Sequence, residues 1–284
     1  MTTGTIVRGR GRGGPGAPVG MAGGRVRAVV LDWAGTTVDF GSCAPAATFV
    51  EAFKRHGVTI SLDDARGPMG MAKRDHIKAI AATPGATAQW AAQHARAFGE
   101  TDIDAIYQTF LPLQEACVEQ FSTVIPGALE MLAAMRARGV RVGSSTGYTR
   151  TIMDRVMRAA AAQGFEVQAM LCASDVEQGR PWPWMIFENM RRLGVCPPSA
   201  VVVVDDTTVG VEAGVNAGAW SVGVAATGNL VGLPLAEFEA LPDDERIARV
   251  ARAREALLHA GAHFVIDGIG DLPRVLDAIE RGWT

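Results

Sequence analysis

The sequence predicts an α/β protein with a doubly wound parallel sheet and a second, all-helical unit inserted into it. Over residues 121–284, short apolar runs alternate with segments whose apolar residues recur at helical spacing. Strands that alternate with helices in this way form parallel, right-handed βαβ units. Residues 45–120, in contrast, are helical in pattern throughout and contain no convincing strand. Because this block directly follows the first strand, we expect it to form a helical cap.

Composition and charge narrow the class of protein. With 284 residues, 48% hydrophobic and 20% charged, the chain has an ordinary globular composition and room for one large domain with an insert. Its formal net charge of −3 indicates no nucleic-acid-binding surface over the body. No apolar run approaches the roughly 18 residues that span a bilayer, so we expect no membrane segment. Four widely spaced cysteines favour a reduced, cytoplasmic protein: Cys43, Cys117, Cys172 and Cys196.

The first 25 residues differ from the rest of the chain. They are rich in glycine, arginine and proline and contain no acidic residue, so we expect residues 1–25 to form a disordered tail. Their arginines could contact nucleic acid, but a solvated tail is the stronger expectation. The remaining chain is expected to divide into an α/β core of residues 26–42 and 121–284 and a cap of residues 43–120.

The first strand is the centre of the prediction. Its apolar run over residues 27–31 ends at Asp32, which opens the sequence Asp-Trp-Ala-Gly-Thr-Thr. A buried strand of this kind delivers a carboxylate to its C-terminal tip, the edge at which open α/β sheets bind ligands. A strand-to-helix turn with a capping aspartate would have the same local sequence, so the other strand ends must decide between the two.

The later strands and helices follow in order. Residues 140–146 are predicted to form a strand that ends in Ser-Ser-Thr, and residues 201–206, the most β-rich run, end in two aspartates. The other expected strands are 169–173, 221–225 and 263–267. Core helices are expected over 128–138, 149–163, 183–193, 211–217 and 243–260, and cap helices over 46–56, 70–82, 87–98 and 102–121.

Polar residues at three strand ends should meet in one crevice. They are Asp32, Thr146 and the pair Asp205 and Asp206, and a loop adds Arg180. Carboxylates from separate strands offer the hard oxygen ligands that suit Mg²⁺. A hydroxyl and an arginine suit the oxygens of a phosphoryl group. Each feature alone is common, but the four together indicate phosphoryl chemistry.

These motifs resemble those of the haloacid dehalogenase superfamily over roughly residues 26–284. Asp32, Thr146, Arg180 and the Asp205–Asp206 pair begin its first to fourth motifs. Longer matches are similar to the phosphonoacetaldehyde hydrolase family within it: Asp-Trp-Ala-Gly-Thr-Thr-Val-Asp from position 32, Pro-Met-Gly from position 68 with Lys73 and His76, Ser-Thr-Gly-Tyr-Thr-Arg from position 145, and Gly-Arg-Pro from position 179. The resemblance implies a haloacid dehalogenase core with a helical cap, and hydrolysis of the C–P bond of phosphonoacetaldehyde to acetaldehyde and phosphate.

The residues themselves argue for the same reaction. Phosphatases of this superfamily have a second aspartate two positions after the nucleophile, and this chain has Ala34 there, which transfers no proton. Lys73 offers another way to activate the leaving group. Its amine can condense with an aldehyde, and the iminium then accepts the electron pair of the breaking bond as an enamine. The amine must be neutral, so we expect burial to depress the pKa of Lys73.

Two neighbours of Lys73 are assigned with it. Met69, Lys73 and His76 are spaced i, i+4 and i+7, so we expect them on one face of a cap helix. His76 is then placed to shuttle protons. Each residue alone also fits an ordinary role: Met69 core packing, Lys73 a surface lysine, His76 a buried structural histidine.

The resemblance implies roles for the remaining site residues. Asp32 is the nucleophile and forms an aspartyl-phosphate, Thr146 and Arg180 bind phosphoryl oxygens, and Met69, Gly70 and Tyr148 line the substrate pocket. Mg²⁺ is held by Asp32, Asp206 and the backbone carbonyl of Ala34. The family also implies a homodimer through the caps. One departure leaves a choice open, because the acid common four residues after the first in the fourth motif is Gly210 here, and Asp205 could replace it.

Two rival functions remain at this stage. A Mg²⁺-dependent phosphomonoesterase or phosphomutase of the same superfamily would share the core motifs, but Ala34 argues against it. A non-catalytic phosphate-binding protein would need no nucleophile, and the presence of Asp32, Lys73 and Asp206 together argues against that.

Overall fold

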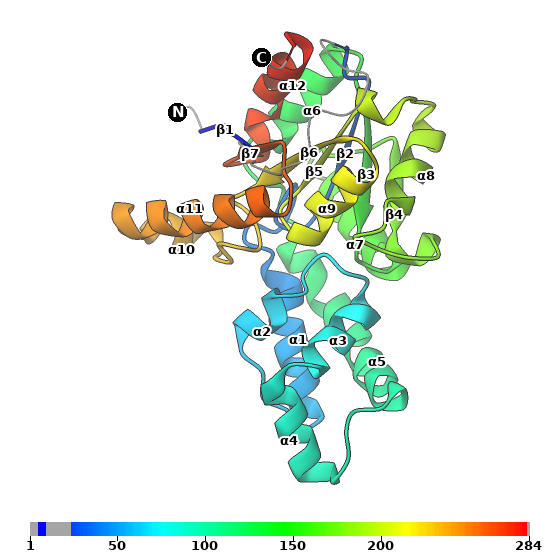
Figure 1. Cartoon of the computed structure of the whole chain (residues 1–284), viewed down its shortest axis with the longest axis vertical. Helices are drawn as coiled ribbons and strands as arrows, with labels where there is room; N and C mark the ends of the chain where they lie inside the picture. The colour runs from blue at the N-terminus through cyan, green and yellow to red at the C-terminus, as the bar shows by residue number, and fades with distance from the viewer. Residues whose placement is uncertain (1–4, 10–23, 283–284) are drawn as a thin grey trace.

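The computed structural model describes residues 5–9 and 24–282, which form an α/β core with a helical unit beyond the carboxyl ends of its strands (Figure 1). The sheet has seven strands in the order β1-β7-β6-β5-β2-β3-β4. All neighbouring strands are parallel except β1 and β7, which confirms the predicted doubly wound sheet. The strands are β1 (Val7–Arg8), β2 (Ala28–Leu31), β3 (Arg141–Thr146), β4 (Ala169–Cys172), β5 (Val201–Asp205), β6 (Trp220–Val224) and β7 (Phe264–Ile266).

The order of the strands places the site at the centre of the sheet. Strand β2 lies between β3 and β5, and the chain turns to one side of β2 first and to the other side later. Ligands of open α/β sheets bind at such a switch point, outside the carboxyl ends of the strands. Every residue of β2 and β5 is buried, as expected for strands covered on both faces.

Helices cover both faces of the sheet (Figure 1). On one face α6, α7 and α12 pack Met131, Ile152 and Leu276 against Val29 and Val202. On the other, α8 and α9 contribute to a cluster that includes Ile186 and Ala213. The core helices are α6 (Ala128–Ala137), α7 (Arg150–Ala161), α8 (Trp184–Leu193), α9 (Thr208–Asn216), α10 (Leu235–Ala240), α11 (Asp243–His259) and α12 (Leu272–Glu280).

The helical unit has a hydrophobic cluster of its own. Phe49, Phe53, Ile77 and Phe110 are fully buried in it, away from the core clusters of the sheet. Figure 1 shows these helices beyond the edge at which β2 ends. The division of the chain at residues 42/43 and 120/121 stays a prediction. The helices are α1 (Cys43–Arg55), α2 (Leu62–Arg66), α3 (Lys73–Ala81), α4 (Pro84–His94) and α5 (Glu100–Cys117).

Part of the N-terminal segment is structured, contrary to the predicted disorder of residues 1–25. Val7–Arg8 pairs antiparallel with β7, and the Gly9 amide donates to the His263 carbonyl over 3.1 Å. The physical reason is that β7 would otherwise leave one row of its peptide groups unpaired at the sheet edge. Residues 1–4 and 10–23, and with them most of the predicted tail, lie outside the described residues. Among the described helices, none is long and apolar enough to cross a bilayer.

Candidate active site

The turn after β2 places two carboxylates side by side. The Asp32 amide donates to the Val204 carbonyl over 2.9 Å, so the ladder to β5 continues to the carboxyl edge of the sheet. The chain then turns through Gly35 at a φ of 90°. A Cβ at that position would lie 2.3 Å from Oδ2 of Asp206. Glycine is therefore required both by the backbone conformation and by the neighbouring carboxylate.

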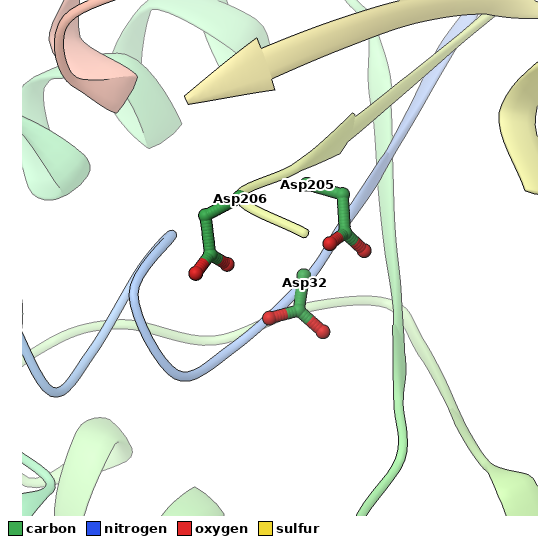
Figure 2. A group of neighbouring side chains, drawn as sticks. All are labelled: Asp32, Asp205 and Asp206. Carbon is green, nitrogen blue, oxygen red and sulfur yellow. The ribbon is translucent and has the colours of Figure 1, made fainter. Parts of the chain in front are cut away.

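Asp32, Asp205 and Asp206 form a buried acidic cluster (Figure 2). Their ligand oxygens lie within 4.8 Å of one another. Asp206 accepts hydrogen bonds from the Thr36 hydroxyl over 2.9 Å and from the Asn229 amide over 2.7 Å. Burial, together with the charges of Asp32 and Asp205, raises the pKa of Asp206 well above its usual value. A divalent cation would offset this repulsion, and oxygen ligands from adjacent strand ends suit one.

Asp205 fills the space that an acid at position 210 would need. A Cβ on Gly210 would lie only 1.9 Å from Cγ of Asp205. Oδ1 of Asp205 accepts from the Thr207 amide and hydroxyl over 2.9 and 2.7 Å. Oδ2 lies 3.0 Å from Nη2 of Arg180 yet has no hydrogen-bond donor, so a buried oxygen remains unsatisfied. An unsatisfied carboxylate oxygen in an acidic cluster fits a metal ligand.

Arg180 connects the acids to the end of β3. Its Nη2 lies 2.8 Å from Oδ1 of Asp32, and it donates to the Ser145 carbonyl and hydroxyl over 2.8 and 2.9 Å. Burial raises the pKa of Asp32 to about 7, and the guanidinium opposes that rise. Thr146, the last residue of β3, accepts from the Tyr148 amide over 3.1 Å. The hydroxyl of Thr146 and the buried guanidinium of Arg180 thus line the same cavity as Asp32, and both groups suit the oxygens of a phosphoryl group.

Lys73 is a buried amine that faces these groups from the cap. It is the first residue of α3, and only 5% of it is exposed. Nζ lies 4.8 Å from the ring centroid of Tyr148 and 5.5 Å from that of Phe49. Burial lowers the pKa of Lys73 to about 7, although the negative charge of Asp32 opposes the change. A substantial fraction of neutral amine is therefore present at neutral pH, as nucleophilic attack requires.

One cavity joins the cap to the core. It is lined from the core by Asp32, Ala34, Ser42, Thr146, Gly147, Tyr148, Arg180 and Thr207, and from the cap by Pro45, Met69, Gly70 and Lys73. Two glycines allow the units to meet so closely. A Cβ on Gly70 would lie 2.4 Å from the Thr207 hydroxyl, and one on Gly147 would lie 2.4 Å from the Met71 carbonyl.

Comparisons with known proteins agree with this geometry. Residues 26–218 match the model of the haloacid dehalogenase-like hydrolases. The chain is 47% identical over 255 residues to the phosphonoacetaldehyde hydrolase of Paraburkholderia phytofirmans, covering 90% of this chain and 96% of that protein. Its counterpart from Bordetella avium is 46% identical over 256 residues, with 90% and 91% covered. The crystal structure of a phosphonoacetaldehyde hydrolase-like protein from Oleispira antarctica matches with a TM-score of 0.90 at 39% identity, covering 92% and 94%.

The chain belongs to the phosphonoacetaldehyde hydrolase family of the haloacid dehalogenase-like hydrolases. It is therefore an enzyme, and the predicted superfamily is confirmed.

The structure of this family member brings together eight of the predicted site residues. Around the one cavity lie Asp32, Ala34, Met69, Gly70, Lys73, Thr146, Tyr148 and Arg180. Asp206 is not part of the lining of the cavity, but it lies beside Asp32 in the acidic cluster. The choice between Asp205 and Asp206 as the main metal ligand stays a prediction, because both carboxylates lie within reach of one ion.

The expectation that Met69, Lys73 and His76 share one helix face is wrong. Helix α3 begins at Lys73, and Met69 lies in the preceding turn, where its amide donates to the Arg66 carbonyl over 3.1 Å. The reason is Gly70, whose φ of 93° interrupts any helix that would start earlier.

His76 does not line the cavity. Its Nε2 lies 2.8 Å from the Ala65 carbonyl, which makes Nε2 the donor, and its ring packs 3.8 Å from the ring of Phe49. Burial, and then the charge of Lys73, lower the pKa of His76 well below its usual value. This environment favours the alternative of a buried structural histidine, and the proton-shuttle role stays a prediction.

Several residues of this hydrolase site carry no signal that sequence reasoning used. Phe49 lies under Lys73 but looks like one more apolar residue of a cap helix. Asn229 binds Asp206 through its backbone, which no side-chain pattern reveals. Thr207 could have been found, since a hydroxyl residue directly after a strand-end aspartate is a common helix N-cap, the position it takes in α9.

Proposed function

We propose that this enzyme hydrolyses the C–P bond of phosphonoacetaldehyde to acetaldehyde and phosphate. The observation that carries the proposal is Lys73, a buried amine whose pKa is lowered to about 7 and which lines the same cavity as Asp32 and Ala34. An ester phosphatase has no use for such an amine and needs an acid where Ala34 stands. The relatives of this chain carry the same activity in their names.

The residues divide the reaction into two covalent stages. Neutral Lys73 adds to the aldehyde carbon and water leaves, which gives a protonated imine next to the phosphonate carbon. An Asp32 oxygen then attacks phosphorus, and the electron pair of the C–P bond moves into the iminium to form an enamine. The phosphoryl group is now an acyl phosphate on Asp32. Protonation of the enamine carbon and hydrolysis of the imine release acetaldehyde, and water attacking the acyl phosphate releases phosphate.

In this proposed reaction, Arg180 and Thr146 bind the oxygens of the phosphoryl group. The guanidinium is held by the Ser145 carbonyl and by Asp32, so its remaining N–H groups are oriented without further rearrangement. Because the protein encloses Asp32, with 6% of the residue exposed, water has little access to the nucleophile before the C–P bond breaks.

The acidic cluster fits Mg²⁺, and we propose Asp32, Asp206 and the Ala34 carbonyl as its ligands, with Asp205 beside them. Bound there, Mg²⁺ would neutralise the charge that develops on the phosphoryl oxygens. The unsatisfied Oδ2 of Asp205 and the raised pKa of Asp206 support a cation at this position.

We also propose a cytoplasmic enzyme that forms a homodimer through its caps. The four cysteines, none of them in a disulfide, support a reducing compartment. The dimer rests on likeness to the family alone, and light scattering on the purified protein tests it.

The decisive experiment traps the imine. Borohydride added with phosphonoacetaldehyde should inactivate the enzyme irreversibly and add a two-carbon mass to the peptide that contains Lys73. Lys73→Arg should be inactive although it keeps a positive charge, because a guanidinium forms no such imine. Release of phosphate from a simple phosphate ester, faster than from phosphonoacetaldehyde, would instead identify a phosphomonoesterase. A label on Lys54 or Lys78 would contradict the assignment of Lys73.

A further inference from the structure

The side chain of Arg66, the last residue of α2, extends from the cap and donates hydrogen bonds to oxygens of residues 41–42 and of the core loop 229–232. Its Nη1 donates to the carbonyl of Gly41 over 2.8 Å and to that of Ser42 over 3.3 Å. The same nitrogen donates to the side-chain and main-chain oxygens of Asn229 over 3.1 and 3.4 Å. Its Nη2 donates to the Gly232 carbonyl over 2.8 Å. One guanidinium therefore joins the cap, the segment that enters it and a loop of the core.

The receiving loop is shaped for this side chain. Gly232 has a φ of 69°, and a Cβ there would lie 2.7 Å from Nε of Arg66. Asn229 is buried, and its Nδ2 donates back to the main-chain carbonyl of Arg66 over 3.1 Å. A planar fork can serve several carbonyls at once, which the single ammonium of a lysine cannot do.

The contacts of Arg66 connect it to Asp206 in the core and to Lys73 in the cap. The main-chain amide of Asn229 donates to Oδ2 of Asp206 over 2.7 Å, so the loop that binds Arg66 also binds that carboxylate. On the cap side, residues 67–72 run from Arg66 over the core and enter α3 at Lys73.

We infer that Arg66 is a positioning residue that latches the cap onto the core, and thereby holds Lys73 over Asp32. Arg66 lies outside the lining of the cavity, so it acts through Lys73 and Asn229 rather than on the substrate. The inference deepens the proposed function and rests on it only in the role given to Lys73.

The test measures how accessible Lys73 is, without any turnover. Wild type, Arg66→Ala and Arg66→Lys are methylated with formaldehyde and cyanoborohydride, and each lysine is quantified by peptide mass spectrometry. Lys54, an exposed residue of α1, is the internal standard in every sample. The matched control is Arg74→Ala, since Arg74 is a cap arginine whose ion pairs, with Glu100 and Asp104, stay within the cap.

We expect both Arg66 variants to raise the Lys73-to-Lys54 labelling ratio at least about tenfold, which corresponds to about 1.4 kcal/mol of lost latch free energy. Arg74→Ala should leave the ratio at the wild-type value. An unchanged ratio in a folded Arg66→Ala protein, or an equal rise in Arg74→Ala, would overturn the latch. If Arg66→Ala does not fold, Arg66→Lys and Asn229→Ala provide the same comparison, because Asn229→Ala removes two latch contacts and keeps the amide that binds Asp206.

Failure of the latch and failure of the proposed function are distinguishable. Labelling needs neither phosphonoacetaldehyde nor Mg²⁺, so exposure of Lys73 in the Arg66 variants would support the latch even if the enzyme acted on another substrate. Conversely, imine trapping at Lys73 in the wild type with an unchanged labelling ratio in the variants would leave the proposed function intact and remove the latch.

Discussion

Replacing Gly210 with alanine should damage both the stability and the metal site of this enzyme. The new Cβ would lie 1.9 Å from Cγ of Asp205, whereas ordinary contact begins at 3.4 Å. Asp205 would have to leave its position, and with it the two bonds from Thr207 and the ion pair with Arg180. Overpacking of a rigid core costs about 1–3 kcal/mol. Breaking up a buried ion pair adds to this, so we expect a loss of about 3 kcal/mol or more.

The assay is urea unfolding followed by circular dichroism, with Mg²⁺ binding measured by calorimetry on the folded protein. Gly85→Ala is the matched control, because Gly85 also lies in a helix, but a Cβ added there would meet no atom within 4 Å. Both glycines lie in the first turn of a helix, where alanine gains less over glycine than the about 1 kcal/mol of a helix interior, so Gly85→Ala should stabilise only slightly. The clash with Asp205 is expected for Gly210→Ala and not for Gly85→Ala.

A second substitution tests the cause. Asp205→Gly removes the side chain that the new methyl group meets, so the double variant Asp205→Gly/Gly210→Ala should be more stable than Gly210→Ala alone. Such non-additivity is expected only for residues in contact. If Gly210→Ala proved as stable as the wild type, or if Asp205→Gly added its own loss to it, the packing of Asp205 against position 210 would be refuted.

Three further outcomes are expected. Asp32→Asn should fold and release no phosphate, because an amide forms no acyl phosphate. Phosphate release by a fresh sample that mass spectrometry shows to be free of deamidation would exclude Asp32 as the nucleophile. Asp206→Ala should weaken Mg²⁺ binding more than Asp205→Ala, because the Arg180 guanidinium already offsets the charge of Asp205, whereas the donors to Asp206, Thr36 and Asn229, are neutral; calorimetry that ranks the two variants the other way would reverse their roles. The pKa of Lys73, lowered to about 7, means that the amine is protonated below and neutral above this pH, so the initial rate of imine trapping should rise between pH 6 and 8; a rise only near pH 10 would indicate an ordinary exposed lysine.

The strand ends explain why the centre of the site could be predicted from the sequence. Asp32, Thr146 and Asp205 each close an apolar run, and parallel strands must bring their carboxyl ends to one edge. The structure confirms that sheet and places these three residues together at its centre. The short apolar runs were enough to predict that these three residues lie together, because the direction of a strand fixes the end of the sheet at which its last residue lies.

Contacts between distant segments are what the sequence could not supply. Spacing suggested one helix face for Met69 and Lys73, but the positive φ of Gly70, which lies against Thr207, prevents the helix from beginning before Lys73. The pairing of Val7–Arg8 with β7 depends on an unpaired sheet edge more than 250 residues away along the chain. Both outcomes are set by what a segment meets in space, which local propensity does not encode.

Relative to an ester phosphatase of the superfamily, the presence of Lys73 and the absence of an acid at position 34 are best explained together. Both line the same cavity, so a carboxylate at position 34 would add a negative charge to the surroundings of the Lys73 amine. An opposite charge there would favour the ammonium form and raise the pKa that burial has lowered to about 7. The acid that protonates an alkoxide in an ester phosphatase would thus deprive this enzyme of its neutral amine. Since an enamine, unlike an alkoxide, forms without a proton from the enzyme at the moment of cleavage, the acid is also not needed. An uncharged side chain at position 34 follows from the chemistry proposed for Lys73.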